Sequence, residues 1–302
     1  MDYKNIASYK STKEIIEKYD FYIKKSYGQN FLVDDHVVSK IINGAQLGAE
    51  DLVIEIGPGL GGLTQVLSGF CKKVICIEID KKLIPILDDV LGGYDNVEII
   101  NEDILKIDLD ALLKANKGYK NIRVVANLPY YITTPIIMFF LECETKVDSL
   151  TIMMQKEVAN RLKAGPKTKD YGSLTIAVSY YANISLVANV PRNCFIPRPN
   201  VDSAVLHLDI LKEPPIDPKP MDEALMFRVI KASFAHRRKT LVNSISSDDS
   251  LGIKKDELIE IIATLDWSEK VRGEELNLSQ YVSLANAIKE INKKSITYCI
   301  NE

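Results

Sequence analysis

The sequence is poor in the residues that bind metals or form disulfides. It has five cysteines without a CxxC pair and three isolated histidines among 302 residues. An odd, scattered set of cysteines is typical of a reducing compartment and excludes a disulfide framework or a zinc ribbon. Because no histidines or cysteines cluster at the spacing of metal ligands, we expect no bound metal.

Long apolar runs and a strong excess of charge are missing as well. No apolar run approaches the roughly 18 residues of a membrane helix, and Met1–Asn5 begin no apolar signal core. We therefore expect no membrane association and a cytoplasmic location. With 46% hydrophobic residues and a net charge of −3 the chain should form a full core. Any binding of nucleic acid would need a local basic surface.

The chain shows an α/β pattern followed by a helical one. Ser11 and Glu14 have capping-box spacing and predict a helix within an N-terminal helical extension, residues 1–26. Beyond residue 50, apolar β-rich segments alternate with helical ones, which indicates a parallel sheet, and two final segments should close it as an antiparallel pair. The seven predicted strands are Leu52–Ile56, Val74–Ile79, Val97–Ile100, Arg123–Ala126, Leu150–Met154, Ile184–Val190 and Ala204–Leu211.

A proline-rich stretch marks the domain boundary. Residues 212–220 contain four prolines in nine positions, as is typical of a linker. Only helical periodicity follows it. We therefore predict an α/β domain over residues 1–212 and a small all-helical domain over residues 213–302.

A glycine-rich turn and two acidic strand ends predict a nucleotide site. Gly57 and Gly59 follow the first strand directly, and glycines there let backbone N–H groups approach a ligand. Glu78 ends the next strand, where a carboxylate can accept both ribose hydroxyls of an adenosine. Asp103, just past the third strand, is placed to accept the adenine amino group. Taken alone, the pattern also fits an NAD site or an ordinary tight turn.

The segment Asn127-Leu128-Pro129-Tyr130 predicts methylation of an exocyclic amine. The Asn127 side-chain carbonyl and the Leu128 backbone carbonyl can accept the two N–H bonds of an adenine amino group and draw its nitrogen toward a nucleophilic geometry. Proline adds no competing N–H, and Tyr130 supplies a flat face for the base. Such preorganised acceptors need neither a metal nor a strong base.

A second proline-stiffened segment and a local basic surplus predict contacts with RNA. Phe195, at the start of Phe195–Ser203, could stack on a base opposite Tyr130 or simply fill a gap in the core. Residues 151–240 hold 14 Lys and Arg against 8 Asp and Glu. That surplus suits phosphate binding, although a solvated basic face would look the same. The candidate RNA-binding residues are Arg161, Lys163, Arg198, Arg237, Arg238 and Lys239.

These motifs together resemble the small-subunit ribosomal RNA adenine-N6,N6-dimethyltransferases of the KsgA type. The resemblance runs from about Lys13 to Ile288, and the residues before Lys13 lie outside it as an expected variable decoration. The segments that carry it include Tyr27–Leu32, Glu55–Thr64, Asn127–Ile132, Met154–Leu162, Phe195–Ser203 and Arg238–Leu241.

The resemblance implies a seven-stranded Rossmann-like class I methyltransferase domain that uses S-adenosylmethionine (SAM), with a small helical C-terminal domain. It implies a monomer that transfers two methyl groups to each of two adjacent adenosines near the 3′ end of small-subunit rRNA, during assembly of the 30S subunit, and releases S-adenosylhomocysteine (SAH). The catalytic residues would be Asn127, Leu128, Tyr130 and Phe195. The cofactor would contact Gln29, Asn30, Leu32, Gly57, Gly59, Glu78, Asp103 and Asn127.

Two other functions remain open at this point. An erythromycin-resistance-type dimethyltransferase, acting on large-subunit rRNA, shares the Asn-x-Pro-Tyr motif, although the longer chain and the Gln155–Leu162 segment argue against it. The main role could also be binding of immature small subunits, with methylation secondary. An NAD-dependent oxidoreductase is disfavoured because the sequence shows no candidate hydride-transfer acid.

Overall fold

The computed structural model describes residues 5–24 and 27–300, with side chains up to Lys293. Residues 1–4 and 25–26 of the predicted N-terminal extension lie outside the described residues. The side chain of Cys299, one of the five cysteines, is also outside the description. The chain forms two compact units. One comprises residues 1–159 and 182–210, and the other comprises residues 160–181 and 211–302.

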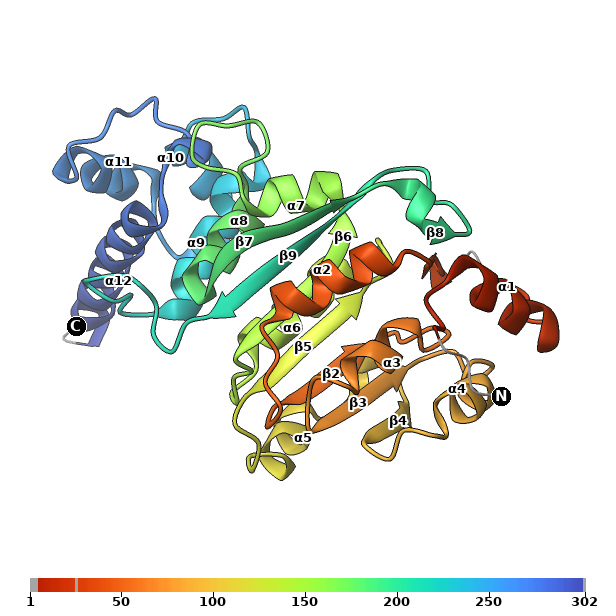
Figure 1. Cartoon of the computed structure of the whole chain (residues 1–302). Coiled ribbons are helices and arrows are strands. Elements are labelled where there is room, and N and C mark those ends of the chain that lie inside the picture. Colours follow the sequence, from red (N-terminus) through yellow and green to blue (C-terminus); the bar gives the residue numbers. More distant parts are fainter. Residues whose placement is uncertain (1–4, 25–26, 301–302) are drawn as a thin grey trace. The chain divides into compact units, whose positions relative to one another are not determined.

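The first unit is built on a seven-stranded sheet, as the sequence predicts (Figure 1). Its spatial order is β4-β3-β2-β5-β6-β9-β7. The first five strands of that order are parallel, and β9 runs antiparallel to both β6 and β7. The strands are β2 (Leu52–Ile56), β3 (Lys73–Glu78), β4 (Val97–Asn101), β5 (Ile122–Asn127), β6 (Ser149–Gln155), β7 (Ala182–Val190) and β9 (Ser203–Ile210).

A second, two-stranded sheet was not predicted. In it β1 (Phe31–Leu32) pairs antiparallel with β8 (Phe195–Ile196), so that Leu32 lies opposite Phe195. Each strand has only two residues, too few for an alternating pattern to be visible in the sequence. This pairing joins two segments that are more than 160 residues apart in the chain.

The helices of the first unit cover the sheet. They are α1 (Tyr9–Lys18), α2 (Asp35–Ala45), α3 (Gly62–Leu67), α4 (Ile84–Leu91), α5 (Leu109–Ala115) and α6 (Thr133–Glu142). Ile41 of α2 and Leu67 of α3 pack with Val53 and Val205 of the sheet in one buried cluster. The predicted capping box at Ser11 is wrong: α1 begins earlier, because the Ser8 hydroxyl accepts a hydrogen bond from the Ser11 N–H at 3.1 Å and forms the N-cap.

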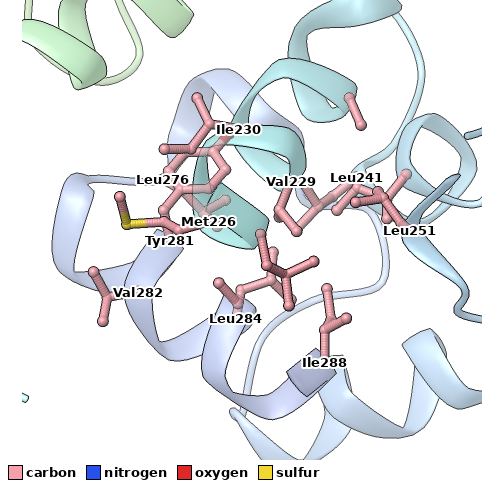
Figure 2. Close-up of a cluster of buried hydrophobic side chains, with 14 of the residues drawn as sticks. Met226, Val229, Ile230, Leu241, Leu251, Leu276, Tyr281, Val282, Leu284 and Ile288 are labelled. Carbon is pink, nitrogen blue, oxygen red and sulfur yellow. The ribbon is translucent and has the colours of Figure 1, made fainter. Parts of the chain in front are cut away.

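Every regular element described wholly within the second unit is a helix, in agreement with the predicted helical domain. Its helices are α8 (Ser173–Tyr181), α9 (Glu223–Ala235), α10 (Leu241–Ile245), α11 (Lys255–Thr264) and α12 (Leu278–Ile300), with short 3₁₀ turns between them. Buried side chains from all five helices belong to one core. Figure 2 shows part of it, with Tyr281 and Leu284 of α12 and Met226 and Val229 of α9.

The boundary between the units differs from the predicted one at residues 160–181. The sequence placed these residues in the α/β domain because they precede the linker. In the structure Tyr171, Ile176 and Tyr180 belong to the core of the helical unit, so α8 belongs there although β7 and β9 follow it in the chain. Helix α7 (Lys156–Leu162) spans the point where the chain passes from one unit to the other. Among the described residues, no helix is both long enough and apolar enough to cross a membrane.

A buried ion pair holds the amino ends of the central strands together. Asp51, which is fully buried before β2, accepts hydrogen bonds from Arg123 Nε at 2.8 Å, Asn121 Nδ2 at 2.7 Å and the Gly48 N–H at 2.9 Å. Arg123 Nη1 also donates to the Ser149 hydroxyl at 3.1 Å. Burial alone would raise the pKa of Asp51, but the hydrogen bonds from Arg123, Asn121 and Gly48 outweigh it and lower that pKa.

We predict that Asp51→Ala lowers the free energy of unfolding by about 3–5 kcal/mol at pH 7, because it leaves Arg123 without its anion. Since the pKa of Asp51 is lowered by folding, this stabilisation is present above about pH 4, the unfolded value, and is lost as the pH falls through the lower folded value. Urea unfolding of both proteins between pH 7 and pH 3 measures the difference.

The matched control is Glu50→Ala, which breaks the neighbouring exposed ion pair with Lys72 at 2.7 Å. It should leave unfolding nearly unchanged, because solvent screens exposed pairs. An equal loss from both variants would contradict the role given to Asp51.

Candidate active site

The first unit contains a cavity of about 280 Å³ at the carboxyl ends of β2, β3 and β5. The chain continues from β2 to β3 on one side of the β2–β5 pair and from β5 to β6 on the other side. Ligands of open α/β sheets bind at such a switch point. All the predicted cofactor residues and three of the four predicted catalytic residues line it. These residues are Gln29, Asn30, Leu32, Gly57, Gly59, Glu78, Asp103, Asn127, Leu128 and Tyr130.

The glycine turn brings the backbone close to the cavity. Gly57 and Gly59 have φ angles of +66° and +61°, a conformation that residues with a Cβ rarely adopt. A Cβ on Gly59 would also lie 3.0 Å from the ring of Phe31. The backbone conformation therefore favours glycine at both positions, and at Gly59 the close approach of Phe31 favours it as well.

Two buried carboxyl groups lie at the cavity wall. Glu78 is 5% exposed, and its Oε1 accepts a hydrogen bond from the Asp80 N–H at 2.8 Å. Burial raises the pKa of Glu78 to about 7. Glu55, at the end of β2, is also buried, and burial raises its pKa to about 7 although Thr64 and Cys76 hydrogen bond to it. Glu55 belongs to the glycine motif of the sequence, but its place in that motif indicated no role for it.

Asp103 serves as an N-cap as well as a cavity wall. Its Oδ1 accepts a hydrogen bond from the Leu105 N–H at 3.1 Å and so begins a 3₁₀ turn over Ile104–Lys106. This local bond orients the Asp103 carboxylate just past the end of β4, where the sequence predicts it.

The side-chain amide of Asn127 has a defined orientation. Its Nδ2 donates a hydrogen bond to the backbone carbonyl of Asn30 at 3.0 Å. Because the donor group is occupied by protein, the Oδ1 atom remains as the acceptor for a ligand. Beyond Leu128, the Tyr130 hydroxyl lies 2.9 Å from the Ser203 hydroxyl, which anchors the phenol ring from its outer end.

Phe195 does not line the cavity. It is 4% exposed and packs with Val37, Ile41 and Val205 in the core of the sheet. The prediction that it faces Tyr130 as the second wall of a base-binding slot is therefore not reproduced. The apolar ring of Phe195 is more stable in the core than in water. The Phe195 backbone pairs with Leu32 of β1, which does line the cavity.

The structure adds wall residues that the sequence motifs did not indicate. Ile6 and Thr12 are buried at the cavity, and the Ile6 N–H donates to Gln65 Oε1 at 2.8 Å. Ile6 and Thr12, which both precede Lys13, are thus part of the cavity wall, and the apolar Ile6-Ala7 pair before the Ser8 cap was the available signal. Tyr27 and Tyr131 also line the cavity, and Tyr131 is 63% exposed at its rim.

The predicted RNA-binding residues fall into two groups. Arg237 is held by protein, because its Nε donates to Glu274 at 3.1 Å and its Nη2 donates to the Lys169 carbonyl at 2.7 Å. Arg237 is nevertheless exposed, as are the other five, Arg198 on the first unit and Arg161, Lys163, Arg238 and Lys239 on the second. Among the described residues, no three His, Cys, Asp or Glu side chains form a group that could hold a metal ion.

Comparison with known proteins identifies the family. The family model described as ribosomal RNA adenine dimethylase matches residues 20–286. The chain belongs to the ribosomal RNA adenine dimethylase family. Its α/β unit and helical unit accordingly have the organisation that the resemblance implied.

Relatives of this dimethylase match it over nearly the whole chain. A protein of Lachnoclostridium phytofermentans named ribosomal RNA small subunit methyltransferase A is 50% identical over 93% of this chain and 97% of its own length. The protein of the same name from Clostridioides difficile is 47% identical over 94% of this chain and 96% of its own.

Two solved structures share the fold. A dimethyladenosine transferase from Plasmodium falciparum superposes with a TM-score of 0.72 at 27% identity and covers 87% of this chain and 98% of its own. The 23S rRNA methyltransferase ErmE gives a TM-score of 0.63 at 25% identity over 86% of this chain and 100% of its own. The fold is therefore common to a protein named as a dimethyladenosine transferase and to one named as a 23S rRNA methyltransferase.

We predict that SAH binding to this dimethylase tightens as the pH rises from 6 to 8. The predicted ribose hydroxyls would donate to the ionised form of Glu78, and burial raises the pKa of that carboxyl to about 7. Below that pKa the proton must first be lost, so the dissociation constant should rise by up to about tenfold per pH unit. Calorimetry across the pH range measures it.

Glu78→Gln should weaken SAH binding about 10- to 100-fold, since a charge-assisted acceptor is lost, and should remove the pH dependence. Glu55→Gln is the matched control, because Glu55 is a second buried carboxyl at the same cavity. If only Glu55→Gln flattens the profile, the titrating group is Glu55 and the assignment to Glu78 is wrong.

Proposed function

We propose that the chain uses SAM to dimethylate N6 of two adjacent adenosines near the 3′ end of small-subunit rRNA, acting as a cytoplasmic monomer on the immature 30S subunit. Membership of the adenine dimethylase family supports the reaction. The 47–50% identity to proteins named small subunit methyltransferase A supports the choice of rRNA.

The cavity fits SAM by its chemistry. Glu78 offers a buried carboxylate for the ribose hydroxyls, and Asp103 offers an acceptor for the adenine amino group. Gly57 and Gly59 bring the main chain against the cavity without side chains of their own. SAM supplies an electrophilic methyl group on a sulfonium, so the protein itself needs no metal or redox group for the transfer.

The orientation of the Asn127 amide is the observation that carries this proposal. With Nδ2 bound to the Asn30 carbonyl, Oδ1 is left to accept one N–H of the target amine. The Leu128 backbone carbonyl would accept the other, and acceptors that are held before the substrate arrives cost no reorganisation. Tyr130 provides the aromatic face for the base. Because a stacked base in a helix cannot present N6 in this cavity, the adenosine must be unpaired or extruded.

Phe195 is proposed to act indirectly. Its ring fills the core behind β8 and so holds the strand that pairs with Leu32. The exposed Tyr131 ring at the rim is better placed than Phe195 to contact RNA in this structure.

A large-subunit target is the second candidate, because ErmE shares the fold. Its identity to this chain is about half that of the small-subunit relatives, which favours the 30S subunit. Methylation of purified 30S and 50S subunits with labelled SAM, followed by mass spectrometry of rRNA fragments, tests the choice. Label confined to 50S subunits would refute the proposed substrate.

A role mainly in assembly predicts that a catalytically inactive variant still supports maturation of the small subunit.

We predict that Asn127→Ala lowers the rate of methyl transfer about 10²- to 10³-fold at saturating SAM, the scale for losing one preorganised polar group. RNA affinity should change little, because phosphate contacts dominate it. Single-turnover kinetics with 30S subunits measure the rate. Asn183→Ala is the control, since Asn183 is also a strand residue of the sheet but is exposed and does not line the cavity. Near wild-type transfer by Asn127→Ala would refute the proposed role of the amide.

We predict that Arg238 and Lys239 bind RNA phosphates whereas Arg237 stabilises the helical unit. The double variant Arg238→Ala/Lys239→Ala should weaken RNA binding and reduce the slope of log K against log salt by about 0.7–0.9 for each phosphate that is no longer neutralised. Arg237→Ala should lower the thermal midpoint and leave that slope unchanged, since its guanidinium is already bound to Glu274 and Lys169. Filter binding across a salt series distinguishes them. An unchanged slope in the double variant would show a merely solvated basic face.

A further inference from the structure

Asp80 is a buried carboxylate beside the cavity that no function described above uses. It lies two residues past Glu78, is 2% exposed and does not line the cavity. Its Oδ1 accepts hydrogen bonds from Lys24 Nζ at 3.0 Å and from the Lys82 N–H at 3.2 Å, and its Oδ2 accepts one from Gln29 Nε2 at 3.0 Å. Burying such a group is costly unless it is fully paired, and here it is paired.

Two of the partners of Asp80, Lys24 and Gln29, belong to the N-terminal part of the chain, more than 50 residues away in sequence. Lys24 and Gln29 are also bound to each other, because the Lys24 N–H donates to Gln29 Oε1 at 2.9 Å. The Lys24 ammonium lies 4.8 Å from the centre of the Tyr27 ring. Gln29 was predicted as a cofactor residue, but both ends of its side-chain amide are committed to protein.

This network reaches the two groups on which the proposed chemistry depends. The Asp80 N–H donates to Glu78 Oε1 at 2.8 Å, and so orients the predicted ribose acceptor. On the other side, Gln29 is followed by Asn30, whose carbonyl accepts the hydrogen bond from Asn127. One carboxylate thus connects the end of β3, the Tyr27–Leu32 wall of the cavity and the amide that faces the target amine.

We propose that Asp80 is a positioning residue that holds the Tyr27–Leu32 wall against the end of β3 and thereby sets the affinity and residence time of the cofactor. It touches neither cofactor nor substrate and acts through Gln29, Lys24 and its own backbone N–H. The proposal rests on SAM as the cofactor but is independent of which rRNA is methylated.

Two single variants disrupt the network in opposite ways. Asp80→Asn removes the charge and replaces one acceptor oxygen by an NH₂ group. That donor would then face another donor, either Gln29 Nε2 or the Lys24 ammonium. Gln29→Glu keeps the charge of Asp80 and places a second carboxylate within hydrogen-bond distance of it. Each should weaken SAH binding about tenfold or more and speed its dissociation, because a buried polar group loses its partner. Calorimetry and stopped-flow displacement measure both quantities.

The double variant Asp80→Asn/Gln29→Glu tests the network itself. It exchanges the amide and the carboxylate between the two positions, so that the hydrogen bond between them and both acceptors for Lys24 are retained. SAH affinity should recover to within about threefold of the wild type. Hydrogen exchange at Tyr27–Leu32 in the SAH complex should be fast in both single variants and slow again in the double variant. In steady-state assays the KM for SAM should rise more than kcat falls.

Asp89→Asn is the matched control. Asp89, on α4, makes an exposed ion pair with Lys18 of α1 at 2.7 Å, so it also ties the N-terminal region to a later part of the first unit but does not line the cavity. SAH binding should stay within about twofold of the wild type. The proposal is overturned if the single variants lower only the thermal midpoint and leave SAH affinity unchanged, or if the double variant shows no recovery. Failure of the 30S assay would leave these binding results intact, so the two proposals fail separately.

Discussion

The parallel pairing of β2 with β5 is the constraint on which the site depends. It sets Ile56 beside Ala126, so the glycine turn after β2 and the Asn127 segment after β5 emerge at the same edge of the sheet. Because the chain leaves these neighbouring strands toward opposite sides, no connection covers the space between them, and a cavity forms there. Glu78 joins the same edge from β3, which pairs in register with β2.

Burial of acidic groups around this edge determines its electrostatics. Burial raises the pKa of both Glu55 and Glu78 to about 7. The hydrogen-bond partners of the buried acids differ, since the Asp80 carboxylate accepts bonds from a lysine, a glutamine amide and a backbone N–H. Glu78 accepts hydrogen bonds from backbone N–H groups among the described residues, which leaves acceptor capacity for hydroxyl donors of a ligand. Asp80 is satisfied internally and is suited to hold structure.

The two predicted residues that the structure moves out of their expected roles show how context overrides residue type. A phenylalanine and an arginine in a nucleic-acid enzyme suggest stacking and phosphate binding. Phe195 instead fills the core beneath β8, and Arg237 spans Glu274 and the Lys169 carbonyl within the helical unit. Both contact sets include residues far away in the chain, Val37 and Ile41 for Phe195 and Glu274 and Lys169 for Arg237, so no local pattern could have revealed them.

The sequence by itself determined the seven strands, their antiparallel ending and the residues at their carboxyl ends, because these depend on local hydrophobic periodicity and on short motifs. Gly57, Glu78 and Asn127 could therefore be placed at one edge of a sheet without coordinates. Only the tertiary structure decided the transfer of residues 160–181 to the helical unit, the β1–β8 pair and the role of Ile6 at the cavity. Each of these depends on contacts between segments that are distant in the chain and too short or too ordinary in composition to specify their partners alone.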